Sequence, residues 1–447
     1  MADGVDRRNV LLLAHTVLSL RYVREHYDLL ASDPRLRFAV ARAPDRMSDG
    51  VEDGIEQLIK DSRQDPNKAE IARVRFEGAG EVPWDLALFG THGSRELLGP
   101  QVPCVHIQHG LGAGKVAEDD DFTYGPQWVR YPSNTPRAGE PLYDVMLESS
   151  YSIRDQAVRN YPPLADRIRV VGDLSVDRLL LADAQRDEYR AALGIAPDQT
   201  ALLLMSTWGP DGLMGPRGEK GIPLLQRATE LGDEYRILLS MHPHLWHGVN
   251  QRVSSFWRPR LAQFRDRNVQ VCSPEEDWSP YLAAADVGII DHGSLGLYYG
   301  LLRRPSIAVP VPERAINPHA PIAELRAASP LLRDPDRLDA TLASTLRSFD
   351  PDLAPPRERI TAHPGQAAEL VLQELYPLMR LPMPSPLPAL TRAPLPRPYP
   401  LNVPRKGQSP KERKPSRPAS RGADPVSPRT PTGRDTPRVR RRPSPPR

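Results

Sequence analysis

The sequence predicts an α/β protein with two doubly wound, Rossmann-like domains that face each other across a cleft, followed by a disordered tail. Short apolar runs alternate with longer amphipathic stretches from residue 9 to about 310, as parallel strands alternate with crossover helices. The alternation also forms two successive series. We therefore expect an acceptor-side domain over 1–185, a nucleotide-donor domain over 186–380 and a tail over 381–447.

The first series opens with NVLLLAH (9–15), an apolar run typical of a buried strand, and a helix is expected near 17–31. The remaining strands of this series are predicted at 37–42, 84–90, 104–110, 144–149 and 167–173. A helical stretch near 183–193 separates the two series. The second series predicts strands at 201–207, 236–242, 269–273, 287–291 and 306–311, and a last helix at 367–379.

Charge is distributed unevenly along the 447 residues. From Leu381 to Arg447 there are 16 Lys or Arg against 3 Asp or Glu, a net +13, so the remainder carries −10 of the total of +3. This segment also holds 19 of the 51 prolines and few large apolar residues, so burial cannot offset the entropy of ordering it. An acidic folded part argues against a nucleic-acid partner. The basic tail is either a peripheral contact with anionic lipid or polymer or, as we favour, a solvated extension.

Several features concern the compartment. The two cysteines, Cys104 and Cys272, fall in predicted strands, which indicates reduced, buried thiols. No run approaches the roughly 18 apolar residues of a membrane span, and the short apolar run near the N-terminus does not resemble a signal peptide. We expect a cytoplasmic protein, with the tail as a route to peripheral contact at the inner face of the cell membrane.

Ligands of open parallel sheets bind at the carboxyl ends of strands, where helix N-termini offer unpaired amides. The first polar strand end, CVHIQHGLGAGKV (104–116), delivers His109 and Gly110 into a glycine-containing loop. A neutral imidazole can accept a proton from a hydroxyl near neutral pH, and glycine lets the backbone approach a ligand. The alternative for His109 is a structural hydrogen bond, and His106 is expected to be a core residue.

Two further strand ends lie in the second series. LLLMSTWGPDG (202–212) ends in Thr207 and Trp208, a hydroxyl for a phosphate and an indole for a base, although Gly-Pro-Asp-Gly is also an ordinary turn. LLSMHPHLWH (238–247) ends a strand at His242, because the following proline cannot continue the ladder. Its three histidines lack Cys or acidic partners at ligand spacing, so no metal is expected.

The fourth strand end is GIIDHGSLGLYYGLLRRP (288–305). Gly293 and Ser294 fall at the start of a helix, whose exposed amides and partial positive charge attract phosphate oxygens. The alternative is that Ser294 only caps the helix and Asp291 only bonds to a turn. The motif argues in part against a hydrolase nucleophile elbow, since G-x-S-x-G requires glycine where His292 stands.

Together and in order, these clusters resemble the CDP-glycerol glycerophosphotransferases of teichoic-acid synthesis. IQHGLG is similar to the family's Trp-His-Gly-Thr-Pro, MSTWG to its Ala-Pro-Thr-Trp-Arg, SMHP to its Lys-x-His-Pro, and IIDHGS to its Asp-Tyr-Ser-Ser. The resemblance covers about residues 100–315. It implies a GT-B fold and transfer of glycerol phosphate from CDP-glycerol to a hydroxyl on a growing polymer at the membrane.

The resemblance also implies roles for the residues that match. His109 would accept the proton of the attacking hydroxyl, and His242 would assist at the donor as the second catalytic residue. The implied substrate-binding residues are Gly110, Thr207, Trp208, Asp291, Gly293 and Ser294. The chain departs from the family at Gln108, Leu111, Gly209, the His292-Gly293 pair and Tyr298, the last of which replaces an aspartate thought to contact the donor.

We therefore expect a transferase that uses no cofactor or metal. It would move a polyol-phosphate (glycerophosphate-like) or glycosyl group from a nucleotide diphosphate donor, with a CDP-linked donor favoured, to a hydroxyl acceptor such as a lipid-linked cell-envelope polymer. A non-hydrolysing sugar-nucleotide 2-epimerase is one alternative, but its carboxylate bases cannot be placed. A catalytically silent module that binds envelope polymer is the other, because several donor contacts are replaced.

Overall fold

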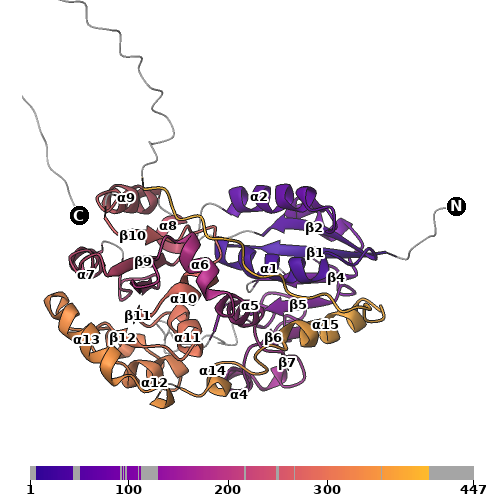
Figure 1. Ribbon diagram of the computed structural model, residues 1–447. Coiled ribbons are helices and arrows are strands. Elements are labelled where there is room, and N and C mark those ends of the chain that lie inside the picture. Colours follow the sequence, from indigo (N-terminus) through magenta and orange to yellow (C-terminus); the bar gives the residue numbers. More distant parts are fainter. Residues whose placement is uncertain are drawn as a thin grey trace, which may run out of the picture. The chain divides into compact units, whose positions relative to one another are not determined.

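The structure is a computed structural model that describes residues 7–43, 51–90, 93, 95, 98–108, 110–111, 129–215, 218–247, 251–265, 267–353 and 355–401, with only the backbone of 251–255. Two parallel β-sheets, each flanked by helices, are built by successive parts of the chain (Figure 1), and the predicted fold class is confirmed. Both sheets lie within one compact unit that ends at Asn402. We refer to them as the first and the second lobe.

The first lobe has a seven-stranded sheet in the order β3-β2-β1-β4-β5-β6-β7. Its strands are β1 (Arg8–Ala14), β2 (Leu36–Arg42), β3 (Ile71–Arg73), β4 (Leu86–Phe89), β5 (Cys104–Ile107), β6 (Val145–Glu148) and β7 (Ile168–Val170). Its helices include α1 (Val17–Leu30), α2 (Val51–Gln64) and α4 (Tyr151–Asn160), with 3-10 turns η1 (Phe76–Glu81) and η3 (Pro162–Leu164). The strands are apolar because both faces of a parallel sheet are covered. Residues 10–14 of β1 are fully buried.

The second lobe has a five-stranded parallel sheet in the order β10-β9-β8-β11-β12. Its strands are β8 (Thr200–Ser206), β9 (Tyr235–Met241), β10 (Val269–Val271), β11 (Val287–Ile290) and β12 (Ser306–Ala308). The surrounding helices are α5 (Leu174–Asp183), α6 (Arg186–Ala192), α7 (Gly221–Ala228), α8 (His244–His247), α9 (Gln251–Ala262), α10 (Ser279–Ala284), α11 (Ser294–Leu301), α12 (Pro321–Ala328), α13 (Leu338–Ser348) and α14 (Arg357–Ile360). Short 3-10 turns are η4 (Glu313–Ala315), η5 (Pro335–Arg337) and η6 (Pro351–Leu353).

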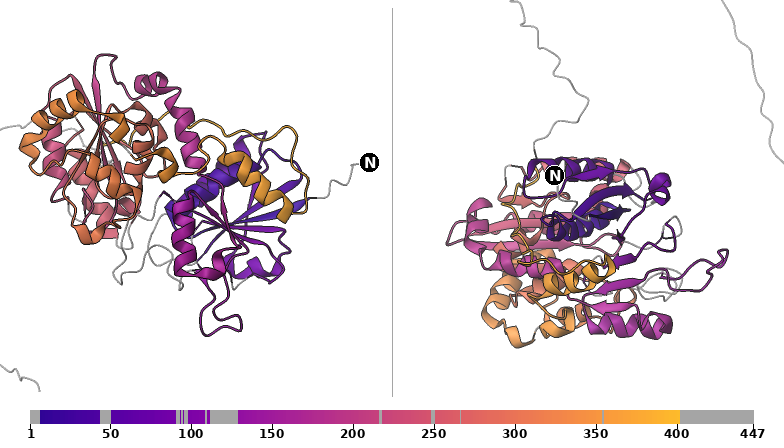
Figure 2. Two further views of the ribbon diagram at one scale, coloured as in Figure 1. Left: turned by 90° about the horizontal axis from the view of Figure 1, so that it is seen from below. Right: turned by 90° about the vertical axis from the view of Figure 1, so that its right-hand side faces the viewer.

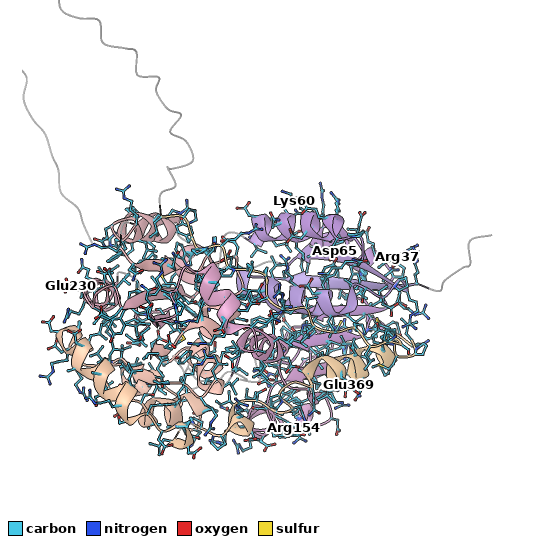
Figure 3. All side chains as sticks on the ribbon, viewed as in Figure 1. Arg37, Lys60, Asp65, Arg154, Glu230 and Glu369 are labelled. Carbon is cyan, nitrogen blue, oxygen red and sulfur yellow. The ribbon has the colours of Figure 1, made fainter. Side chains whose placement is uncertain are left out.

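Helices cover both faces of each sheet, as the views along and across the strands show (Figure 2). Charged side chains lie at the surface of these helices and strand ends (Figure 3). The labelled examples are Arg37, Lys60, Asp65, Arg154, Glu230 and Glu369. None of the helices in the described ranges is long and apolar enough to cross a membrane. Cys104 and Cys272 are both free and buried, as the sequence predicts.

The last helix, α15 (Ala367–Leu378), belongs to the first lobe and not to the expected 186–380 domain. Its apolar face, including Leu372 and Leu375, packs in one core cluster with Val10 and Leu12 of β1. Asp177 of α5 holds the start of this helix, because its carboxylate accepts from the amides of Gly365 (2.6 Å) and Ala367 (2.8 Å). A helix with an apolar stripe packs where a sheet face is open, and sequence order does not specify which sheet that is.

Two other domain boundaries differ from the predicted ones. The core of the second lobe already includes Val176 and Leu179 of α5, so that lobe begins before the predicted residue 186. Residues 381–401, expected to be disordered, form an extended segment with contacts to both lobes, which we call the strap (Figure 1). Residues 402–447 lie outside the described residues.

The strap is anchored by single side chains and backbone groups. Leu381, Met383 and Leu390 pack against the core of the first lobe. Ala393 is fully buried in the core of the second lobe, where its carbonyl accepts from the Tyr189 hydroxyl at 2.6 Å. The amide of Tyr399 donates to Val271 O of β10 at 2.7 Å, and the two rings of Tyr399 and Trp246 lie 4.8 Å apart. These contacts replace the secondary structure that a proline-rich segment cannot form.

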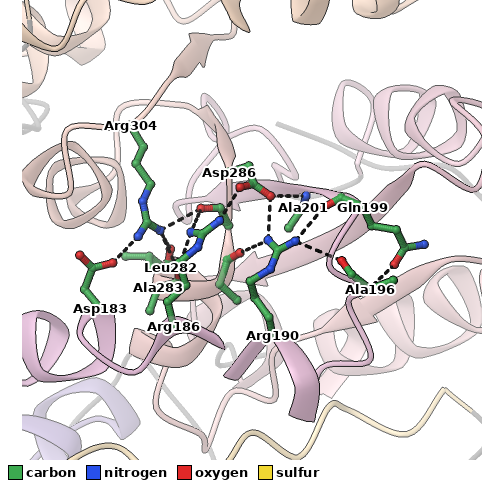
Figure 4. A network of polar contacts seen from close by, with 12 residues as sticks. Asp183, Arg186, Arg190, Ala196, Gln199, Ala201, Leu282, Ala283, Asp286 and Arg304 are labelled. Atoms are coloured by element: carbon green, nitrogen blue, oxygen red, sulfur yellow. Dashed lines mark hydrogen bonds and ion pairs between the residues drawn. The ribbon is translucent and has the colours of Figure 1, made fainter. Parts of the chain in front are cut away.

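A network of three arginines joins the amino-terminal ends of β8 and β11 to the end of α10 (Figure 4). Asp286, just before β11, accepts from Arg186, from Arg190 (2.8 Å) and from the amide of Ala201 (2.8 Å). Arg186, Arg190 and Arg304 also donate to the carbonyls at the end of α10. Cations at a helix C-terminus satisfy its unpaired carbonyls and oppose its dipole. This end of the sheet is therefore fixed by ionic and hydrogen-bond contacts.

Candidate functional site

A pocket of about 750 Å³, counted with part of its open mouth, lies between the carboxyl ends of the second sheet and α1 of the first lobe. It is lined by residues that follow β8, β9, β10 and β11, by the start of α11, and by one face of α1. The order of the second sheet reverses between β8 and β11, so the pocket lies at the switch point where open α/β sheets bind ligands. Thr207, His242, Asp291, Gly293 and Ser294, all predicted site residues, line it.

Asp291 organises the loops around this pocket. Its Oδ2 atom accepts from the amides of Thr207 (2.8 Å) and Leu213 (2.9 Å), and its Oδ1 atom accepts from the amide of Gly293 (2.8 Å). The residue is 3% exposed. Both carboxylate oxygens are thus bonded to backbone amides, so Asp291 positions the loops after β8 and β11.

The start of α11 differs in one respect from the expectation. Gly293 is the N-cap residue and Ser294 the first residue of the helix, so the Ser294 side chain is not the cap. The Gly293 amide is bonded to Asp291, which removes it from the amides expected to hold a phosphate. The Ser294 and Leu295 amides have no acceptor among the described residues and remain as donors for an anion.

Close packing explains the glycine at position 293. A Cβ atom there would lie 2.8 Å from Thr207 Cβ and 3.1 Å from Asp291 Oδ1, closer than side-chain carbons approach. A larger residue would separate the loop after β8 from the start of α11. Glycine therefore allows the two loops at the switch point to touch.

His242 lies at the end of β9, and its ring has defined neighbours. Its amide donates to Ser206 O at 2.9 Å, and its Nδ1 atom accepts from the His244 amide at 3.1 Å. The rings of His242 and His244 stack at 5.0 Å and 15°. Trp208 does not line the pocket; it is 38% exposed, with its ring 6.2 Å from His242 and 5.3 Å from His244. Trp208, which was predicted to contact the nucleobase, is thus an aromatic side chain beside the pocket and not part of its lining.

The loop after β5 brings the first lobe to the same place. Gly110 has φ +102°, and a Cβ atom there would be 3.4 Å from both Ser294 Oγ and Tyr22 Oη, so the backbone passes beside the start of α11. Leu111 packs in the core of the second lobe. The Gln108 side chain holds the end of β5. Its Nε2 atom donates to Gly110 O (2.7 Å), and its Oε1 atom accepts from the backbone amide of Ser149 (2.6 Å). His109 lies outside the described residues, as do 112–128, which include the acidic run 119–121.

His106 is a core residue, as expected: it is 1% exposed and its ring lies 5.2 Å from that of Tyr143. His247 contacts Glu275 at 3.1 Å. In the ranges that the structure describes, no three His, Cys, Asp or Glu side chains are arranged to hold a metal ion.

Several pocket residues belong to none of the four strand-end clusters and were not predicted from the sequence. Arg21 and Tyr22 come from the face of α1, and Glu276 and Trp278 from the loop after β10. Tyr298, which replaces the family's aspartate, donates to Asp173 Oδ2 at 2.7 Å, and its ring lies 4.4 Å from that of Trp278. The start of α1 at the carboxyl end of the first sheet could have indicated Arg21 and Tyr22. The polar residues that follow the strand at 269–273 could have indicated Glu276.

Buried charges at the pocket wall and next to it join the lobes. Arg21 of α1 bonds Asp277 of the second lobe at 2.9 Å, its guanidinium lies over Trp278, and Arg178 reaches Asp277 at 3.3 Å. Burial alone would raise the pKa of Asp277. The nearby charges of Arg21 and Arg178 outweigh this effect and lower the pKa to about 2. Glu25 accepts from Ser175 Oγ at 2.8 Å, and its burial raises its pKa to about 7 despite Arg178 and Arg21.

We expect Glu25→Gln to flatten the pH dependence of stability. Glu25 has a folded pKa of about 7 against an ordinary 4.5, so the folded state holds a proton that the unfolded state has released. Stability therefore falls as pH rises from about 4.5 to 7, at about 1.4 kcal/mol per unit of pKa difference. Asp177, with a pKa raised by burial to about 6, adds a fall of the same sign that the variant retains. Asp277 adds no slope here, since its pKa of about 2 lies below this window.

Urea unfolding at pH 5, 6, 7 and 8 measures this effect. Glu25→Gln should gain stability relative to the unmodified chain as pH rises, by at most about 3 kcal/mol between pH 5 and 8. Glu230→Gln, a change at an exposed surface glutamate, is the matched control and should give a parallel profile. Parallel profiles for Glu25→Gln would contradict the assigned titration.

The sequence of residues 100–311 matches the family model described as CDP-Glycerol:Poly(glycerophosphate) glycerophosphotransferase. No curated protein matches the chain. The predicted resemblance is confirmed over this stretch, which holds all the strand-end clusters.

Solved structures share the fold. A structure of the wall teichoic acid polymerase TagF is 16% identical with a TM-score of 0.56, and the match covers 84% of this chain and 90% of that one. Another TagF structure, of a histidine-to-alanine variant, is 15% identical with a TM-score of 0.53 and coverage of 85% and 92%. UDP-GlcNAc 2-epimerase from Neisseria meningitidis, bound to UDP-GlcNAc, is 11% identical with a TM-score of 0.48 and coverage of 82% and 99%.

Proposed function

We propose that this divergent member of the CDP-glycerol:poly(glycerophosphate) glycerophosphotransferase family transfers a glycerophosphate-like or glycosyl group from a nucleotide diphosphate donor to a hydroxyl acceptor in cell-envelope polymer synthesis. The observation that carries the proposal is the pocket at the switch point of the second sheet. There, two unpaired amides at the start of α11, those of Ser294 and Leu295, lie with His242 in one cavity. Such a set favours a phosphate group.

The donor side of the reaction follows from these groups. With a polyol-phosphate donor, a new P–O bond forms to the acceptor oxygen and the P–O bond to the leaving nucleotide breaks. Negative charge then grows on the leaving nucleoside monophosphate, where the α11 amides and His242 can stabilise it. Asp291 fixes the geometry of these loops. Arg21 is already paired with Asp277, so the α11 amides and His242 are the groups assigned to the phosphates.

We assign the acceptor side to the first lobe, with His109 as the base that takes the proton of the attacking hydroxyl. Support comes from its described neighbours: Gln108 anchors the strand end and Gly110 passes beside Ser294. The acceptor would be a hydroxyl of an envelope polymer carried on a lipid. The reaction would take place on the cytoplasmic side, where the net +11 of residues 402–447 (14 Lys or Arg against 3 Asp or Glu) would suit an anionic membrane surface.

Ligand-induced stabilisation tests the proposal. We expect CDP-glycerol to raise the melting temperature more than UDP-, GDP- or dTDP-linked donors, since a ligand at 100 times its Kd adds about 2.7 kcal/mol. Ser294→Pro should abolish the shift by removing one amide, at a first helical position that accepts proline. Ser294→Ala keeps that amide and is the matched control. No shift with any donor would contradict a nucleotide-diphosphate site.

Turnover separates this enzyme from the alternatives. With an acceptor present, we expect release of nucleoside monophosphate if a polyol phosphate is transferred, or of nucleoside diphosphate if a glycosyl group is transferred. His109→Ala should lose this turnover and still bind the nucleotide donor. An epimer formed from a UDP-sugar without acceptor would favour the epimerase. Donor binding without turnover in the unmodified chain would favour the silent binding module.

A further inference from the structure

The ring of His242 is held by a local hydrogen bond on one edge. The His244 amide donates to its Nδ1 atom at 3.1 Å, across Pro243, which has no N–H of its own. The backbone of His242 is fixed in turn, because its amide donates to Ser206 O at 2.9 Å and its carbonyl accepts from the Leu245 amide at 2.9 Å. The bond to Nδ1 therefore comes from a backbone position that the end of β9 and the start of α8 determine.

This bond decides which nitrogen carries the proton. A neutral imidazole has one N–H and one acceptor nitrogen, and a nitrogen that accepts an amide N–H cannot carry a hydrogen. We infer that the backbone amide of residue 244 fixes His242 as its Nε2–H tautomer, so that His242 donates a hydrogen bond to a donor phosphate oxygen and does not serve as a base. Residue 244 is then a positioning residue whose backbone sets the chemistry of its neighbour.

The inference rests on the proposed function for its ligand, and it divides the two expected catalytic histidines into different roles. A hydrogen-bond donor stabilises the charge that develops on the leaving phosphate, whereas proton abstraction belongs to the acceptor side. Protonation of His242 would require Nδ1 to give up the amide. Among the described residues, the His244 ring stacks on the His242 ring and Trp208 lies beside it, and Glu276, Asp291 and Arg21 line the same pocket.

Two substitutions at position 244 isolate the amide. His244→Ala removes the stacked ring but keeps the amide, whereas His244→Pro removes the amide at the first residue of α8. The proline also strains the turn from His242 O to the Leu245 amide. Any effect of the ring alone appears in both variants. An effect of the hydrogen bond appears only with proline.

Nitrogen NMR of the full chain labelled with ¹⁵N-histidine reads the tautomer directly and needs no substrate. His242→Gln identifies the His242 signals by their loss. We expect the Nε2–H form in the unmodified chain and in His244→Ala, and a shift toward the Nδ1–H or doubly protonated form in His244→Pro. A dominant Nδ1–H form in the unmodified chain would overturn the inference. This outcome does not depend on whether the protein uses a nucleotide diphosphate donor.

Kinetics give a second readout that holds even where the proline variant does not fold. The amide nitrogen of Gln reaches the place of Nε2, whereas that of Asn matches Nδ1. His242→Gln should keep kcat within about tenfold, while His242→Asn should lose about 10²–10³-fold, the effect of one lost transition-state donor. Equal losses in both variants would contradict the role of His242 as a hydrogen-bond donor. Absence of turnover in the unmodified chain would instead contradict the proposed function.

Discussion

Asp291→Ala should lower the free energy of unfolding by about 3–5 kcal/mol and abolish donor binding. The carboxylate accepts three backbone hydrogen bonds, from Thr207, Leu213 and Gly293, in a place that is 3% exposed. Each buried amide that loses its acceptor costs about 1–3 kcal/mol. The loss should also release the loops after β8 and β11 from each other, which moves Thr207 away from the start of α11.

Urea unfolding and the thermal shift with CDP-glycerol measure the two effects. Ser294→Ala is the control in the same turn, because its side chain accepts none of these amides, and its stability should change by no more than about 0.5 kcal/mol. A stable Asp291→Ala that still binds the donor would show that the loops keep their geometry without the carboxylate.

Ending the chain after Arg380 should lower stability by about 3 kcal/mol or more relative to ending it after Leu401. The two chains differ only by the strap, whose Ala393 and Tyr399 lie on the second lobe and whose Leu381, Met383 and Leu390 lie on the first. Full burial of one large apolar side chain contributes about 1.5–3 kcal/mol, and several strap residues are partly buried. The strap also contacts the pocket wall, since the Arg397 amide donates to Glu276 at 2.7 Å.

Thermal unfolding and donor affinity of both chains, beside the full chain, provide the measurement. Ala393→Asp in the full chain is the point variant that tests the same contact, because a carboxylate there would be buried without a partner. If the shorter chain melts with the longer one and binds donor equally well, the strap does not hold the lobes.

Part of the pocket lining in the second lobe could be predicted from the sequence, for a physical reason. Polar residues such as Thr207, His242 and Asp291 stand directly after apolar runs, and the carboxyl ends of parallel strands meet at one edge. Knowing the strands was therefore enough to bring these residues together. The same rule located Gly110 in the first lobe, beside Ser294.

Other parts depend on contacts that leave no local signal. Arg21 and Asp277 are 256 residues apart and pair only because two folded lobes meet. The short strand β3 has three residues, too few for a recognisable period. The strap resembles a disordered segment in composition, and it is held by scattered side chains and backbone groups, such as the ring and the amide of Tyr399. Helix α15 shows an apolar stripe but no preference for either sheet.

The arginine network at the amino-terminal ends of β8 and β11 has a consequence for redesign. Asp286 and its arginines fix that end of the sheet without any side chain that lines the pocket at the opposite end. Pocket positions such as Glu276 and Tyr298 could thus be randomised together, in a library aimed at a new nucleobase or transferred group, while the scaffold retains an independent anchor. Such a library should yield a larger folded fraction than one of equal size drawn from the Asp286 network.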